Sequence, residues 1–262
     1  MSQVRVSAVI VCLTLACAAS AVEPPANHRN FISCPIVRDT PTVPCWLAEY
    51  GGELYYLGIQ TDVSAEFHPP LLGHKVLVEG TVKDGPRICG GVVLEPLKVS
   101  PLAELDGTCN TILPAEEQYT VPFAPRPPGP SGGRLAFDAA PGAPRAAPPP
   151  LTGPQEFVLY YDFDMRIGGR HSNILSRIYD YASAQRKPKL DIACHRGSTL
   201  LSNGALITER ADLGIERAHE LVKLLRGAEL VADTHVEDTP TLTPANGNAD
   251  WQQRRCVVRV EP

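Results

Sequence analysis

The first part of the chain is patterned for short β-strands separated by turns. Apolar runs at 45–50 and 53–59 flank Gly51-Gly52, and this spacing predicts a β-hairpin. Residues 74–82 alternate between apolar and polar positions, as a half-buried strand does. The strand-like runs lie at 31–37, 45–50, 53–59, 74–82 and 89–97. The pattern predicts a small all-β domain over 27–118, built as a barrel or a sandwich.

The last part of the chain mixes helical and strand-like periods. Apolar residues recur at helical spacing over 172–185 and 213–225, and the second helix is expected to end at the basic-then-glycine pair Arg226-Gly227. Strand-like runs lie at 157–161, 190–194, 231–237 and 256–260. The predicted order over 156–262 is β-α-β-α-β-β. This order indicates an α+β fold with helices packed on one mixed sheet.

Proline separates these two parts. The chain of 262 residues contains 26 prolines, about twice the usual share. Eleven of them fall between Pro122 and Pro154, where glycine and alanine fill most other positions. Residues 119–155 are therefore expected to form an extended Pro-rich linker without a core, which serves either as a long spacer or as an ordinary connector.

The N-terminus has the layout of a secretory signal peptide. Arg5 precedes an apolar stretch over 6–19, and small residues end it at Ala21. Cleavage of residues 1–21 is expected, with lipidation at Cys17 as an alternative because 15–17 partly resembles a lipobox. No other run approaches the roughly 20 apolar residues that span a bilayer, so the mature chain is expected to have no transmembrane segment.

Charge argues against a nucleic-acid partner. The net charge is -5, and residues 27–118 contain twice as many acidic as basic side chains. The stretch 73–99 weakly resembles an OB-fold barrel, and many such barrels bind nucleic acid through basic grooves with stacking aromatics. The acidic excess makes that partner class unexpected here.

Six cysteines remain beyond the predicted signal peptide. An even number in an oxidising compartment favours disulfides. No pair has zinc-ligand spacing, so neither a metal nor a cofactor is expected. The six are Cys34, Cys45, Cys89, Cys109, Cys194 and Cys256.

Three blocks of the last 107 residues resemble the OmpA-like C-terminal domain of bacterial envelope proteins. Residues 160–164, Tyr-Tyr-Asp-Phe-Asp, resemble the family's opening strand end. Residues 213–218, Leu-Gly-Ile-Glu-Arg-Ala, resemble its helix motif, and residues 253–257, Gln-Arg-Arg-Cys-Val, resemble its closing motif. The family binds the meso-diaminopimelate residue of peptidoglycan non-covalently. The resemblance covers 156–262 and is silent on the N-terminal part.

The resemblance implies a set of ligand-binding residues. Arg217 and Arg255 match the family's arginines, and a guanidinium can grip a carboxylate with two hydrogen bonds. His195 is kept from the family's strand-end motif, but Gly197 stands where the family has the aspartate that binds the ligand ammonium. Arg210 falls on the family's asparagine position.

The loop before the second helix is about five residues longer than usual for the family, and Asp212 or Glu209 could supply the missing acid. Two structural alternatives stay open. Arg217 could instead pair with Asp162 or Asp164, and His195 could be an ordinary turn residue.

The resemblance also sharpens the disulfide expectation. If the second and last strands of the domain meet at one site, Cys194 and Cys256 are neighbours and are expected to form a disulfide. The four N-terminal cysteines allow three pairings, of which Cys34–Cys45 with Cys89–Cys109 has the shortest loops.

Two function hypotheses follow. The first is a non-enzymatic periplasmic or outer-membrane-associated protein that binds peptidoglycan through Arg217 and Arg255, and other envelope proteins through its N-terminal domain. The alternative is an OmpA-like protein-interaction module that has lost diaminopimelate binding. An enzyme is not expected, because the chain has no nucleophile elbow, zinc spacing or convincing triad.

Overall fold

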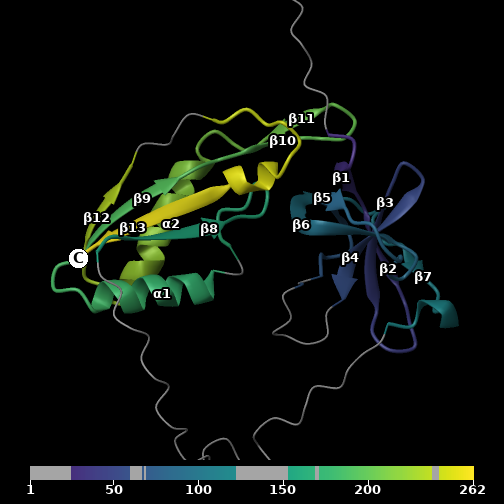
Figure 1. Ribbon diagram of the computed structural model, residues 1–262, viewed down its shortest axis with the longest axis horizontal. Coiled ribbons are helices and arrows are strands. Elements are labelled where there is room, and N and C mark those ends of the chain that lie inside the picture. The colour runs from purple at the N-terminus through teal and green to yellow at the C-terminus, as the bar shows by residue number, and fades with distance from the viewer. Residues whose placement is uncertain (1–24, 60–66, 68, 122–152, 169–170, 238–241) are drawn as a thin grey trace, which may run out of the picture.

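A computed structural model of the chain describes residues 25–59, 67, 69–121, 153–168, 171–237 and 242–262 (Figure 1). They form a β domain (residues 25–121) and an α+β domain (residues 153–262) that lie side by side. The predicted signal peptide at 1–21, Cys17 and most of the predicted linker lie outside the described residues. Among the helices that are described, none is long and apolar enough to cross a membrane.

Seven strands form one sheet in the β domain, in the order β1-β5-β6-β4-β3-β2-β7. The β2–β7 and β4–β6 pairs are parallel and the others are antiparallel. The predicted hairpin at Gly51-Gly52 is confirmed: both glycines have positive φ, 62° and 78°, which glycine adopts without steric cost. The strands are β1 (His28–Ser33), β2 (Pro35–Arg38), β3 (Cys45–Tyr50), β4 (Glu53–Ile59), β5 (His74–Val82), β6 (Val92–Leu105) and β7 (Ile112–Leu113).

This sheet is strongly curved. Only Cys34 separates β1 from β2, yet the two strands lie near opposite ends of the strand order. Because neighbouring strands are about 4.8 Å apart, one residue can join them only if the sheet curls back on itself. Buried Phe31, Tyr55 and Val76 pack inside the curve. The described strands form no closed barrel, so the expected barrel or sandwich is confirmed only as one curved all-β sheet.

Four strands and two helices make up the main body of the α+β domain. The strand order is β12-β9-β13-β8, with β12–β9 parallel and the other pairs antiparallel. The predicted element order is confirmed, with one addition: the long loop after β9 contains a hairpin, β10–β11. The elements are β8 (Gln155–Tyr160), α1 (Ser172–Ser183), β9 (Lys189–Cys194), β10 (Ser198–Leu200), β11 (Leu206–Thr208), α2 (Leu213–Gly227), β12 (Asp233–Val236) and β13 (Arg255–Glu261).

Both helices pack on one face of that sheet. Ile178 of α1 and Leu221 of α2 share a single buried core with alternate residues of the three longest strands, among them Leu159, Ile192 and Val258. The alternation follows from the two-residue period of a strand, which places every second side chain on the same face. The mixed α+β architecture expected from the sequence is therefore present.

The six cysteines within the described residues form three disulfides. Cys194 and Cys256 face each other across β9 and β13, with Cα atoms 4.0 Å apart, so the expected Cys194–Cys256 disulfide is confirmed. In the β domain the bonds are Cys34–Cys109 and Cys45–Cys89. The shortest-loop pairing does not form, because the curled sheet, and not proximity along the chain, sets which cysteines meet.

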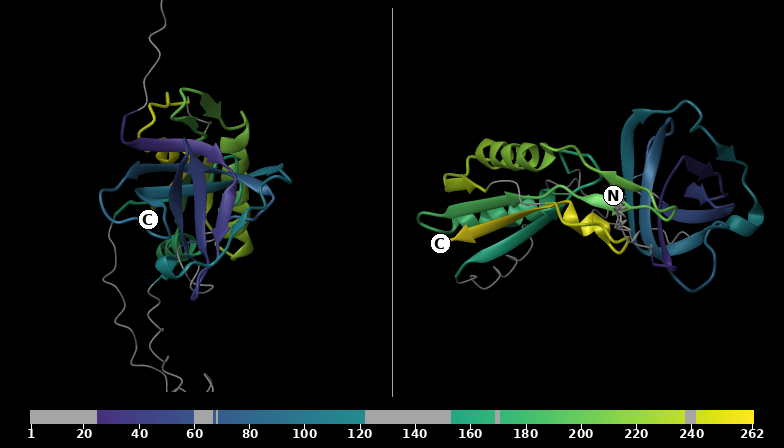
Figure 2. Two further views of the ribbon diagram at one scale, coloured as in Figure 1. Left: turned by 90° about the vertical axis from the view of Figure 1, so that its right-hand side faces the viewer. Right: turned by 90° about the horizontal axis from the view of Figure 1, so that it is seen from above.

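The two domains share a buried apolar contact. Leu77 of β5 packs with Phe163 and Leu201 of the α+β domain in one buried cluster. The β10–β11 hairpin and the short helix η3 (Asp250–Gln253) extend from the α+β domain toward the β domain (Figure 2, right). The two domains are therefore in direct contact in the described structure.

Polar groups fix the same contact. Asn30 of β1 is 3 % exposed and donates from Nδ2 to the carbonyl oxygens of Leu200 and Gly247, at 3.0 and 2.9 Å. Ser202 in the hairpin donates its backbone N–H to the carbonyl of Asn30 at 2.7 Å. These directional bonds fix how the hairpin sits against β1.

Candidate functional site

Arg217, the candidate carboxylate-binding residue of α2, is fully buried. Its side chain is 0 % exposed, as is the side chain of Glu209, which lies in the turn between β11 and α2. Nη2 of Arg217 donates to Oε1 of Glu209 at 2.7 Å, and Nη1 donates to Oε2 at 3.0 Å. The two-pronged grip expected for a ligand carboxylate is therefore made on a carboxylate of the chain itself.

The other Arg217 donors are also used. Nε donates to the carbonyl oxygen of Met165 at 2.9 Å, and Nη1 to that of His195 at 3.0 Å. Nη2 makes a longer bond, 3.4 Å, to the carbonyl oxygen of Asp162. A guanidinium has five N–H donors, so all of them have partners. These contacts support the alternative that Arg217 has a structural role. Its acidic partner, however, is Glu209 and not Asp162 or Asp164.

Glu209 is equally well partnered. Besides the two bonds from Arg217, its carboxylate accepts the backbone N–H groups of Asp164 and Gly197, each at 2.8 Å. A buried ion pair offsets its desolvation cost only when its remaining polar groups find partners, as they do here. The sequence offered Glu209 as a substitute acid for a ligand ammonium, and the structure instead uses it to neutralise Arg217.

The Tyr161 ring completes the surroundings of Arg217. The guanidinium carbon lies 4.6 Å from the ring centroid, a cation–π distance. Burial raises the pKa of the Tyr161 hydroxyl to about 12, against the opposing effect of the Arg217 charge. The phenol therefore stays neutral at physiological pH, and the site holds one paired charge of each sign.

Gly197, where the resemblance would place the aspartate for the ligand ammonium, leaves little room for any side chain. A Cβ at this position would lie 2.7 Å from Cγ of Arg254 and 3.2 Å from Cβ of Gln253. Arg254 is itself fully buried, so it cannot move aside cheaply. The absence of an acid at 197 is consistent with this packing.

Arg210 and Asp212 are exposed, whereas the Arg217–Glu209 pair is buried. Arg210 is exposed and forms ion pairs with Asp164 at 3.3 Å and Glu216 at 3.2 Å. The hydrogen bond that Arg210 donates to Glu216 is the main cause that raises the pKa of Arg210. Asp212 is exposed at the N-terminal boundary of α2 and makes no side-chain capping bond there.

Arg255 and His195 are neighbours at the ends of β13 and β9. The backbone N–H of His195 donates to the carbonyl of Arg255 at 2.7 Å, and Nη1 of Arg255 donates to the Gln252 carbonyl at 2.8 Å. Burial, and secondarily the charge of Arg255, lower the pKa of the His195 ring. The structure brings these two residues together near Arg217, whose Nη1 donates to the His195 carbonyl, but the Arg217 side chain itself is buried.

Sequence reasoning missed a second buried charged group, at the domain contact. Arg254 donates to Glu79 of β5 with both terminal nitrogens and to Thr199 Oγ1 at 2.9 Å, while Thr199 donates to Glu79 at 2.9 Å. Arg254 and Glu79 are far apart in the chain and carry no shared motif. Their pairing could not have been read from the pattern of either segment alone.

Comparison with models of known protein families finds no match for this chain. Comparison with curated proteins finds no match either.

Proposed function

We propose that the chain is a non-enzymatic cell-envelope protein whose α+β domain is an OmpA-like protein-interaction module that no longer binds diaminopimelate. One observation carries the proposal: the arginine that would grip the ligand carboxylate is fully buried and saturated by Glu209. A ligand could reach Arg217 only by displacing a carboxylate that accepts four hydrogen bonds. The alternative hypothesis from the sequence is thus the better supported of the two.

The missing aspartate supports the same conclusion. The ammonium of diaminopimelate needs an acid at the position of Gly197, and the packing of Arg254 against Gly197 leaves no space for one. Glu209, the nearest candidate substitute, is already neutralised. Neither Arg217 nor Glu209 is free to pair with a charged end of the ligand.

The domain contact makes the two domains one unit, and the proposal assigns to that unit the binding of other proteins. The β and α+β domains share an apolar cluster, a buried ion pair and the Asn30 hydrogen bonds, so they present one continuous surface. We assign the partner class to other envelope proteins. The disulfides fit an exported chain, and periplasmic residence is part of the proposal.

The finer architecture of the β domain is proposed to be OB-like. A single bent strand, β1 continued by β2 through Cys34, lies near both ends of the sheet. This is how a partly open five-stranded barrel brings its first strand to both sides. The strand order supports this assignment. If β1 and β2 count as one strand, β3, β4, β5 and β6 bring the number of long strands to five.

The test is a titration of the full chain with the stem tripeptide that ends in meso-diaminopimelate, followed by NMR. We expect no saturable shift of the amide signals of 195–197, 209–217 or 255. An established diaminopimelate-binding OmpA-like domain serves as the positive control. Saturable shifts at these residues that disappear in Arg255→Ala would overturn the proposal and restore peptidoglycan stem binding.

A further inference from the structure

A groove lies between the two helices of the α+β domain. It has a volume of about 330 Å³ and runs between α1 and the last turns of α2. Both helices pack on the sheet, α1 on β8 and β13 and α2 on β9, β12 and β13 (Figure 1). The groove is lined by helix residues and opens to solvent. The lining residues of this helix groove are Leu175, Ser176, Tyr179, Asp180, Leu224, Leu225 and Ala228.

The walls of the helix groove carry large apolar side chains that face solvent. Tyr179 of α1 is 37 % exposed, and Leu224 of α2 is 44 % exposed. Single exposed apolar residues are ordinary, but apolar residues gathered around a hollow are typical of contact surfaces. A partner that covered the groove would remove both side chains from water, which is favourable.

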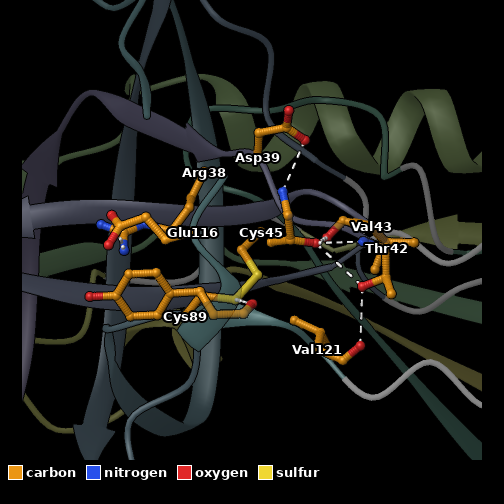
Figure 3. The surroundings of a disulfide bond; sticks show 10 residues. Arg38, Asp39, Thr42, Val43, Cys45, Cys89, Glu116 and Val121 are labelled. Atoms are coloured by element: carbon orange, nitrogen blue, oxygen red, sulfur yellow. Dashed lines mark hydrogen bonds and ion pairs between the residues drawn. A yellow bond between two sulfur atoms is a disulfide. The ribbon is translucent and has the colours of Figure 1, made fainter. Parts of the chain in front are cut away.

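The hollow in the β domain is of a different kind. It lies beside the Cys45–Cys89 disulfide, and Tyr119 forms part of its wall. The guanidinium carbon of Arg38 lies 3.9 Å from the centroid of the Tyr119 ring, and Nη1 of Arg38 lies 3.7 Å from Glu116 (Figure 3). Charged side chains surround this hollow, so it provides a control for the apolar helix groove.

Two opposite charges stand on the outer sides of the helices that form the groove. Asp180 lies two residues after buried Ile178 on α1. Lys223 lies two residues after buried Leu221 on α2. Two residues along a helix differ in direction by about 200°, so both charged side chains leave their helix on the side away from the core.

Neither charge has a close partner in its own chain. Within the described residues, the ion pairs of α1 and α2 are those of Glu216, Arg217 and Lys223, so Asp180 has none. Nζ of Lys223 lies 3.9 Å from Oε1 of Glu220, and the lysine side chain is 79 % exposed. A contact this long and exposed contributes little, so both charges are available to a partner.

We infer that the helix groove is a docking surface for a second copy of this chain, related to the first by a twofold axis. In such a dimer the same patch meets itself, so the patch must be self-complementary. The helix groove provides both a hollow and the exposed Leu224 that enters the hollow of the other copy. The twofold axis also pairs Asp180 of each copy with Lys223 of the other, so the ion pair forms twice.

The mixed signs of charge favour a second copy over a strongly charged partner. An acidic protein or an anionic membrane would be repelled by Asp180, and a basic partner would be repelled by Lys223. Self-association satisfies both charges together. The inference goes beyond the proposed binding of other envelope proteins and does not depend on it.

Analytical ultracentrifugation of the full chain over a series of concentrations tests the inference. We expect an equilibrium between monomer and dimer. Leu224→Glu should weaken dimerisation by about a hundredfold, because the twofold axis removes the apolar contact twice. Leu206→Glu changes another exposed leucine of the same domain, and Gln118→Glu adds a negative charge at the β-domain hollow. Both controls should dimerise as the wild type does, and circular dichroism checks that every variant is folded.

The charges give a second, sharper test. Asp180→Lys and Lys223→Asp should each weaken dimerisation by about tenfold, because each brings like charges together in the dimer. The double variant should recover the wild-type affinity, since the two ion pairs form again with their signs exchanged. Loss of structure in one helix would not be repaired by a change in the other.

Several results would overturn the inference. They are a wild-type chain that stays monomeric at every concentration, a dimer that Leu224→Glu leaves unchanged, and a double charge variant that dimerises no better than either single variant. A photo-crosslinking benzoylphenylalanine in place of Tyr179 checks for another occupant in the cells that make the protein. It should join two copies of the chain, and crosslinks only to a different protein would assign the groove to that protein instead.

Discussion

Glu79 of the β domain and Arg254 of the α+β domain form a buried ion pair that joins the two folded parts of the chain. Their side chains are 2 % and 0 % exposed, and Thr199 bonds to both. Each charge was removed from water and is neutralised only by a partner on the other domain. Substitution of either residue alone would therefore leave the other charge buried without a partner at the domain contact.

Removing one partner should destabilise the chain strongly. We expect Glu79→Ala to lower the free energy of unfolding by about 3–5 kcal/mol, because it leaves Arg254 buried without a counter-charge. The double variant Glu79→Leu with Arg254→Met should recover most of this loss, since it removes both charges. Urea denaturation followed by circular dichroism measures both, and additive losses in the double variant would contradict the pairing.

The same logic applies to Arg217 and Glu209. We expect Glu209→Gln to cost about 3–5 kcal/mol of unfolding free energy, because the fully buried Arg217 would keep its charge without compensation. Glu216→Gln, on the exposed side of α2, is the control and should change stability by less than about 1 kcal/mol. A near-neutral Glu209→Gln variant would show that Arg217 is open to solvent or to a ligand.

Gly197→Ala tests the packing between residue 197 and Arg254. The added methyl would contact Arg254 Cγ at 2.7 Å, and we expect a loss of about 1–3 kcal/mol from the resulting strain. Gly107→Ala is the comparison, since nothing lies within 4 Å of a Cβ there. Thermal denaturation measures the melting temperatures of the two variants, and we expect Gly197→Ala to have the lower one. Equal melting temperatures would mean that residue 197 has room for a side chain.

The disulfides make a direct chemical prediction. Thiol titration of the mature, denatured and unreduced protein should find all six cysteines of the folded domains blocked, and peptide mapping should recover Cys34–Cys109, Cys45–Cys89 and Cys194–Cys256. Replacing both Cys194 and Cys256 by alanine should lower stability by about 4 kcal/mol, given a separation of 62 residues. Recovery of a Cys34–Cys45 peptide would refute the β-domain pairing.

Acid should weaken the fold through His171. Its ring is buried and donates from Nε2 to the carbonyl of Tyr160 at 2.7 Å, and burial lowers its pKa below the ordinary value of 6.5. The unfolded chain therefore binds the proton first, so stability is complete above pH 6.5 and is lost as pH falls toward the pKa of the folded state.

Urea denaturation at pH 7.5 and pH 5.5 measures this loss. His171→Asn should reduce the difference between the two pH values, whereas the exposed His219→Asn should not. Because the lowered pKa of His195 contributes in the same direction, part of the slope should remain in His171→Asn. An unchanged slope in that variant would rule out His171 as a source.

The sequence by itself determined the local elements. The period-2 and period-3.6 patterns located most strands and both helices, and Gly51-Gly52 fixed the hairpin because only its backbone freedom suits that turn. The resemblance added the Cys194–Cys256 pairing. The strands, helices and hairpin depend on residues close together in the sequence. The disulfide expectation depends on the order of the motifs within the last 107 residues.

Tertiary structure decided everything that depends on which distant segments meet. The pairing of Cys34 with Cys109 follows from the curl of the sheet, and the burial of Arg217 follows from the hairpin that delivers Glu209. Arg254 lies within a motif of the sequence, yet its partner Glu79 is 175 residues away. Charge pairing across such separations leaves no periodic trace in the chain, so only the folded contacts reveal that the candidate ligand site is closed.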